Sequence, residues 1–75
     1  DALDPSIAPG TATREPNGLN YEECQQLLQG LTKLYSIVSL DVVEVNPLID
    51  PSGLTATVAS RLILDFLINY CDKTI

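Results

Sequence analysis

The chain has 75 residues, two cysteines, no histidine and a formal net charge of −6 at pH 7. Its four basic residues form no cluster that would meet phosphates, so nucleic acid is not expected as a partner. No stretch approaches the roughly 18 unbroken apolar residues of a membrane span, so no membrane partner is expected either. Without histidine or a C-x-x-C spacing, a zinc site built from this chain alone is not expected.

A long loop is predicted over residues 1–19. This stretch shows no sustained apolar period, and it holds three of the five prolines together with Gly10 and Gly18. Loops longer than about 12–15 residues in compact domains are usually functional or flexible.

A helix is predicted over residues 20–35. Asn20 offers an N-cap side chain, and Glu23 three residues later completes a variant of the capping box. Apolar side chains then recur three or four positions apart, which is typical of a helix with one apolar face. They are Tyr21, Cys24, Leu27, Leu28, Leu31, Leu34 and Tyr35.

A strand is predicted over residues 37–45, where β-branched side chains are nearly continuous. Such a run is typical of a strand covered on both faces, and therefore of a parallel sheet flanked by helices. Asn46-Pro47 ends the run. One strand cannot form a sheet, so this segment needs partner strands from a longer chain.

A second helix is predicted over residues 54–72. The turn sequence Asp50-Pro51-Ser52-Gly53 precedes it, and either Ser52 or Thr55 can cap its start. Its apolar stripe is Val58, Ala59, Leu62, Ile63, Phe66, Leu67 and Tyr70. Both cysteines fall within helical patterns, which favours buried thiols in a cytosolic or organellar protein over a disulfide. The order of loop, helix, strand and helix indicates the α/β class.

Three carboxylates stand out on chemical grounds. Asp4-Pro5 can simply begin a turn while Asp1 is solvated. Alternatively, Asp1 and Asp4 bind a divalent cation such as manganese, which carboxylate oxygens suit. Glu44 needs a partner, because a buried unpaired carboxylate costs several kcal/mol; the partner is either a lysine of the missing sheet or a bound ligand.

The motifs around these carboxylates resemble those of the ureohydrolases, the manganese enzymes that include arginase and agmatinase. That family carries S-x-D-x-D-x-x-D-P-x-x-x-P-G-T and later E-V-N-P or a close variant. This chain enters the first pattern part-way, at Asp1, and carries E-V-N-P from Glu44. The resemblance implies that residues 1–75 are the C-terminal part of a single ureohydrolase domain, with 1–19 as active-site loop. The implied fold is a loop-helix-strand-helix fragment of a three-layer α/β/α fold with a mainly parallel sheet.

The resemblance assigns roles to four residues. Asp1 matches the second aspartate of the D-x-D pair, which ligates one of two Mn²⁺ ions; most of the other ligands lie outside this chain. Asp4 matches the aspartate before proline, which is interpreted as fixing the loop behind that ligand. Glu44 matches the glutamate that pairs with the substrate's guanidinium group, whose planar fork suits a carboxylate. Thr13 matches the threonine that lines the guanidinium pocket.

The loop departs from the family pattern at three positions. Ala12 and Asn17 replace glycines, and Arg14 replaces a proline. Asn17 can still adopt the left-handed conformation. At Ala12 the methyl group clashes if the backbone there needs a positive φ.

The implied function is manganese-dependent hydrolysis of a guanidino substrate, with arginine giving ornithine and urea as the first candidate because the motif is E-V-N-P. The alternatives are an agmatinase-type hydrolase and a non-catalytic truncated module used only in assembly. The resemblance further implies a homo-oligomeric parent, trimeric or hexameric, in the cytoplasm, or in mitochondria if it is of the plant type. No catalytic group lies in this chain, so the isolated chain is expected to be inactive.

Overall fold

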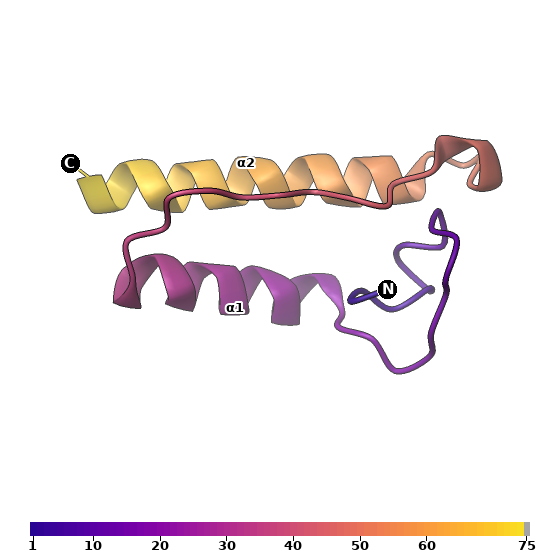
Figure 1. Ribbon diagram of the computed structural model, residues 1–75, viewed down its shortest axis with the longest axis horizontal. Coiled ribbons are helices and arrows are strands. Elements are labelled where there is room, and N and C mark those ends of the chain that lie inside the picture. Colours follow the sequence, from indigo (N-terminus) through magenta and orange to yellow (C-terminus); the bar gives the residue numbers. More distant parts are fainter. Residues whose placement is uncertain (75) are drawn as a thin grey trace.

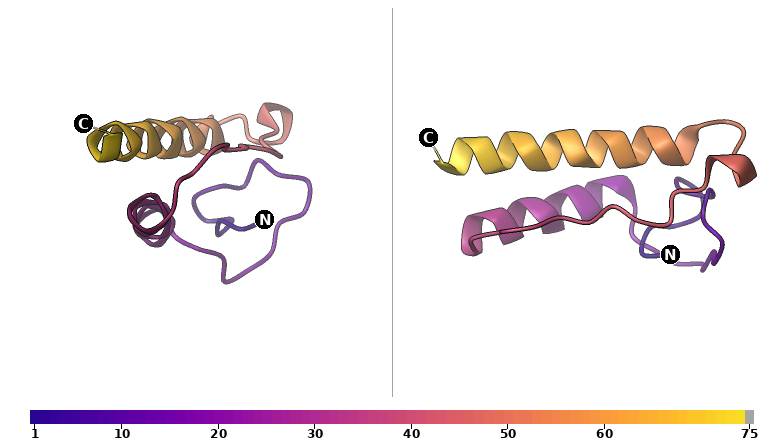
Figure 2. Two further views of the ribbon diagram at one scale, coloured as in Figure 1. Left: turned by 60° about the vertical axis from the view of Figure 1, so that its left-hand side comes forward. Right: turned by 45° about the horizontal axis from the view of Figure 1, so that its top comes forward.

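Two helices dominate the computed structural model, which describes residues 1–74 (Figure 1). Helix α1 spans Tyr21–Leu34, a short 3-10 helix η1 spans Pro47–Ile49, and helix α2 spans Leu54–Thr74. The two long helices lie side by side and run in the same direction, while the chain between them runs back in the opposite direction (Figure 1). In both views of Figure 2 the N-terminal loop lies at the end of the molecule where α1 and α2 begin.

Local hydrogen bonds define the start of α1. The Asn20 side chain accepts a hydrogen bond from the Glu23 amide at 2.8 Å, and the Glu23 carboxylate accepts one from the Asn20 amide at 3.0 Å. The expected capping box is therefore present, with two amides satisfied reciprocally. At the other end the Tyr35 amide donates to the Leu31 carbonyl at 2.9 Å. The helix predicted over 20–35 is thus α1 together with its two cap residues.

A tight turn leads into α2. The Gly53 amide donates to the Asp50 carbonyl at 3.1 Å, which closes the turn predicted at Asp50-Pro51-Ser52-Gly53. The Ser52 hydroxyl accepts from the Leu54 amide at 3.1 Å, and the Asp50 carboxylate accepts from the Thr55 amide at 2.8 Å. Ser52 and Asp50 therefore satisfy free amides at the helix start, as such caps do. The Thr55 hydroxyl instead accepts a hydrogen bond from the Gly10 amide at 2.7 Å.

The strand predicted over 37–45 is not formed in residues 1–74. That segment is extended (Figure 1), but it pairs with no other strand among the described residues. Val38 is 94% exposed and Val43 is 70% exposed, so the burial on both faces that a sheet would give is not present within residues 1–74. The physical reason is that a strand requires a hydrogen-bonding partner strand. Within the described residues, sheet-like pairing is limited to an isolated parallel bridge between Leu3 and Leu19.

The core between the helices is small. Phe66 is the buried apolar residue of α2, and its ring stacks on Tyr70 with centroids 6.3 Å apart. Asp65 accepts hydrogen bonds from the Tyr21 hydroxyl and, at 3.0 Å, from the Gln25 amide group. Polar contacts therefore join α1 to α2 alongside the apolar ones.

Helix α2 is long and mainly apolar. Residues Leu54–Asp72 reach a mean hydropathy of 1.2, which is enough to cross a membrane by length and composition alone. Arg61 and Asp65 interrupt this helix, so it is not an unbroken apolar run. The finding is weak evidence for a membrane span, because the core helix of a soluble protein passes the same test.

Amide exchange tests the state of the extended segment. In the 75-residue chain we expect the amides of residues 37–45 to exchange faster than those of α1, because no partner backbone covers them. Hydrogen-exchange mass spectrometry or NMR measures this directly. Strong protection over 37–45 in a monomer would show that the segment pairs with another part of the chain.

Candidate functional site

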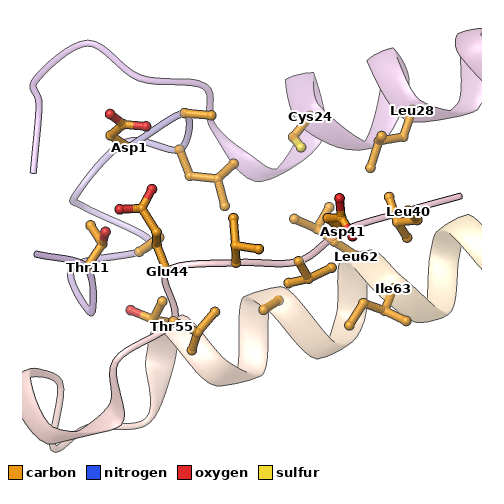
Figure 3. Close-up of a pocket in the computed structure, with 17 residues that line it drawn as sticks. Asp1, Thr11, Cys24, Leu28, Leu40, Asp41, Glu44, Thr55, Leu62 and Ile63 are labelled. Carbon is orange, nitrogen blue, oxygen red and sulfur yellow. The ribbon is translucent and has the colours of Figure 1, made fainter. Parts of the chain in front are cut away.

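A cavity of about 320 Å³ lies between the N-terminal loop, the segment 40–45 and the facing sides of α1 and α2 (Figure 3). Its body is apolar, with Leu28 from α1 and Leu62 and Ile63 from α2 among the lining side chains. Oxygen-bearing side chains line it as well: Asp1, Thr11, Asp41, Glu44 and Thr55. An apolar cavity with a few polar groups is the usual form of a small-molecule site.

The structure brings together two of the four predicted site residues. Asp1 and Glu44 both line the cavity, and in Figure 3 the Glu44 carboxylate points toward Asp1. Thr13 is exposed and is not among the lining residues. Asp4 also lies outside the lining, in the loop behind Asp1.

Glu44 has a strained backbone. Its φ is 63°, in the left-handed region that residues with a side chain rarely adopt. For a non-glycine residue this conformation costs roughly 1–2 kcal/mol. Such strain persists only where the surrounding structure enforces it, and it clusters at functional sites. The backbone therefore supports Glu44 as a functional residue independently of any motif.

Asp4 holds the two ends of the loop together. Its carboxylate accepts hydrogen bonds from the Ser6 hydroxyl at 2.5 Å, the Ser6 amide at 2.9 Å and the Gly18 amide at 3.2 Å. The Ser6 hydroxyl is the main cause that lowers the pKa of Asp4, followed by the Ser6 amide. Gly18 packs so tightly that a Cβ there would lie 2.5 Å from the Asp4 amide nitrogen. That Asp4 fixes the loop remains a prediction. The hydrogen bonds to Ser6 and Gly18 are the contacts through which it would do so.

The loop accommodates its departures from the family pattern. Asn17 has a φ of 59°, the left-handed conformation that the sequence allowed for it. Among the described residues, positive φ values otherwise occur at Glu44 and Gly53. Ala12 is therefore not forced into the conformation in which its methyl group would clash.

Thr11 lines the cavity, whereas the family motif assigns the guanidinium pocket to Thr13. Only 6% of Thr11 is exposed, and its hydroxyl oxygen has no hydrogen-bond partner within the described residues. A buried hydroxyl without a partner is costly and calls for a ligand or a further segment. Because Thr11 and Thr13 share one loop, only the tertiary structure distinguishes which of them faces the cavity.

A buried polar cluster at the start of α2 borders the cavity, which Thr55 itself lines. The Thr55 hydroxyl accepts from the Gly10 amide at 2.7 Å, and Asp50 accepts from Ser52 and Thr55. The hydroxyls of Ser52 and then Thr55 hold the pKa of Asp50 at about 2, below its ordinary value of 3.8. Asp50 is therefore ionised at neutral pH although little of it is exposed.

The family model that describes the arginase family matches residues 1–69. The chain belongs to the arginase family. The resemblance of its motifs to the ureohydrolases is thereby confirmed.

Individual relatives carry different names. Over 66 residues the chain is 48% identical to an arginase of Staphylococcus aureus, covering 88% of this chain and 22% of that protein. Over 67 residues it is 45% identical to a guanidinopropionase of Pseudomonas aeruginosa, covering 89% and 21%. Its structure matches the agmatine ureohydrolase of Thermoplasma volcanium with a TM-score of 0.84 at 36% identity, covering 97% and 24%. The chain thus spans only 21% to 24% of the length of these arginase-family proteins.

The donor set of this arginase-family chain fits a manganese ion only in part. Asp1 supplies a carboxylate, the donor type that manganese prefers. Among residues 1–74, however, no group of three or more histidine, cysteine or acidic side chains is placed to hold a metal. Asp1 alone would not hold a metal ion, so the described residues do not form a manganese site by themselves.

The low pKa of Asp50 predicts a pH dependence of stability in the full-length protein. As pH falls from about 4 toward 2, the unfolded chain takes up a proton on Asp50 while the folded chain does not, so the folded state loses stability. Compared with Asp50→Asn, the wild type should therefore lose its advantage in unfolding free energy across this range. Denaturant unfolding of both proteins between pH 2 and 6 measures it; a constant difference would contradict the assignment.

Proposed function

We propose that this chain is the C-terminal segment of a manganese-dependent guanidino hydrolase, and that the cavity holds the guanidinium end of its substrate. The observation that carries the proposal is that Asp1, Thr11 and Glu44 line one cavity although they come from distant parts of the sequence. Membership in the arginase family supports the reaction class.

Glu44 is the group that binds the guanidinium. A carboxylate accepts two parallel N–H bonds from a guanidinium fork, which fixes orientation as well as charge. The left-handed backbone at Glu44 aims this carboxylate into the cavity. The unpartnered Thr11 hydroxyl can accept a further N–H from the same group, which would remove its buried-oxygen penalty. Thr13 keeps its proposed place near the guanidinium, supported by the family motif alone.

Asp1 is proposed as one manganese ligand. Bound manganese would lower the pKa of a water so that hydroxide is available near neutral pH. Asp1 lines the same cavity as Glu44, so a guanidinium held by Glu44 lies near the proposed metal position. Asp4 fixes the loop that carries Asp1, through its bonds to Ser6 and Gly18.

The segment 37–45 is proposed to become a strand of a mainly parallel sheet in the full-length protein, within a three-layer α/β/α fold. Its backbone is extended and its valine side chains are exposed, so partner strands and covering helices could pack against it. The TM-score of 0.84 against a solved ureohydrolase supports the same arrangement of loop and helices.

Arginine is the proposed substrate because the chain carries E-V-N-P, and agmatine is the alternative. The relatives are named arginase, guanidinopropionase and agmatine ureohydrolase, and substrates of all three would present a guanidino group. The Glu44 end of the cavity binds this shared guanidino group. The other end of the substrate must be recognised by residues outside this chain.

A truncated module that serves only in assembly is the remaining alternative. The exposed side chains of Leu64 and Ile68 on α2 favour contact with another element or subunit.

Substitution of Glu44 tests the substrate site. In the full-length protein we expect Glu44→Gln to lower kcat/KM by roughly 30-fold to several-thousand-fold, since losing a charge-assisted bidentate pair costs about 2–5 kcal/mol. The amide keeps the shape but presents an NH₂ donor to the donors of the guanidinium. Manganese content should stay unchanged.

Two further variants separate the roles. Asp1→Asn should deplete manganese first and activity with it, whereas Glu22→Gln, on the exposed face of α1, should change neither quantity. Steady-state urea release and metal analysis measure both. If Glu44→Gln retains near wild-type kcat/KM, Glu44 has only a structural role and the assignment is wrong.

The isolated 75-residue chain is expected to release no urea from arginine. Residues 1–74 offer a single proposed manganese ligand and no sheet to support Glu44. The measurement is urea formation with added Mn²⁺ against a protein-free control. Activity above that control would show that the chain carries a complete site.

A further inference from the structure

Both backbone polar groups of Gly10, the residue before Thr11, form hydrogen bonds with distant segments. The Gly10 amide donates to the Thr55 hydroxyl at 2.7 Å, and the Gly10 carbonyl accepts from the Asn46 amide at 2.7 Å. Gly10 therefore joins three segments: the N-terminal loop, the chain just after Glu44 and the first turn of α2.

Thr55 is itself fixed in place. Its amide donates to the Asp50 carboxylate at 2.8 Å, and that carboxylate also accepts from the Ser52 hydroxyl at 2.5 Å. Asp50 and Thr55 are both buried. A buried network whose members all have partners is rigid and specifies one geometry.

Packing around Gly10 leaves no room for adjustment. A Cβ on Gly10 would lie 2.8 Å from the Thr55 hydroxyl oxygen and 2.9 Å from the Asp50 Cβ. The loop backbone thus rests directly on these two side chains. Movement of Thr55 must therefore move the residues on either side of Gly10, including Thr11.

We infer that Thr55 is a positioning residue for the guanidinium site, acting through Gly10 on Thr11 and, through Asn46, on Glu44. The inference rests on the proposed function and deepens it. The Thr55 hydroxyl is occupied by the Gly10 amide, so Thr55 sets the separation of the groups that touch the substrate. Asn46 is two residues after Glu44, so its bond to Gly10 restrains the strained backbone there.

The test uses the full-length protein and three threonine variants. Thr55→Val keeps the branched shape but removes the acceptor of the Gly10 amide, whereas Thr55→Ser retains the hydroxyl. Thr32→Val is the matched control: Thr32 is 2% exposed, its hydroxyl donates to the Gln29 carbonyl at 2.7 Å, and it does not line the cavity.

We expect Thr55→Val to raise amide exchange at Gly10 and Asn46 and to lower kcat/KM by about 10- to 100-fold, since small misplacements of binding groups have effects of that size. KM should rise more than kcat falls, because the guanidinium contact exists before the reaction. Thr55→Ser should keep amide exchange and kcat/KM at their wild-type values, and Thr32→Val should change neither. Asp50→Asn, which loosens the hold on Thr55, should show the same effects in weaker form and serves if Thr55→Val does not fold.

Unchanged exchange at Gly10 and Asn46 in Thr55→Val and Asp50→Asn would overturn the inference, as would a kinetic effect no larger than that of Thr32→Val. The exchange measurement needs no substrate. Failure of the wild type to release urea from any guanidino compound would therefore overturn the proposed function separately.

Discussion

The hydrogen bond from the Gly10 amide to the Thr55 hydroxyl is the constraint on which the arrangement of the site depends. It is buried, and it joins residues 45 positions apart in the sequence. Few apolar side chains are buried in the described part of the chain, with Ala8 and Phe66 as the apolar core. Burial of apolar side chains alone therefore does not fix the position of the loop. The buried polar cluster around Asp50 fixes the position of the loop more closely than apolar packing does. Its hydrogen bonds are directional, and leaving them unmade is costly.

Strain and restraint occur together in this small structure. The left-handed backbone at Glu44 is unfavourable for a residue with a side chain. Two residues later, Asn46 is held both by Gly10 and by its own side chain, which accepts from the Leu48 amide at 3.0 Å. The chain after Glu44 is thus anchored, while residues 37–43 before it are extended and exposed. The carboxylate proposed to bind the guanidinium therefore lies at the boundary between an anchored segment and an unpaired one.

The helices contribute a frame rather than chemistry. α1 and α2 run parallel and are joined by the hydrogen bonds that Asp65 accepts from Tyr21 and Gln25. This contact keeps Leu28 of α1 and Leu62 of α2 on opposite walls of the cavity (Figure 3). The exposed apolar side chains along 37–45 show how much surface this frame leaves uncovered. A parallel sheet between helices, as proposed for this segment, would cover that surface.

The features that the amino-acid sequence was sufficient to determine are those that depend on a few neighbouring residues. The Asn20–Glu23 capping box, the Ser52 cap, both helices and the left-handed Asn17 belong here, because their partners lie within about one helical turn. The family motifs also identified Asp1 and Glu44, which share one cavity. Only the tertiary structure decided that 37–45 is unpaired, that Thr11 rather than Thr13 lines the cavity, and that Thr55 holds Gly10 instead of capping its own helix. Each of these depends on contacts between segments distant in the chain, and local periodicity carries no information about such contacts.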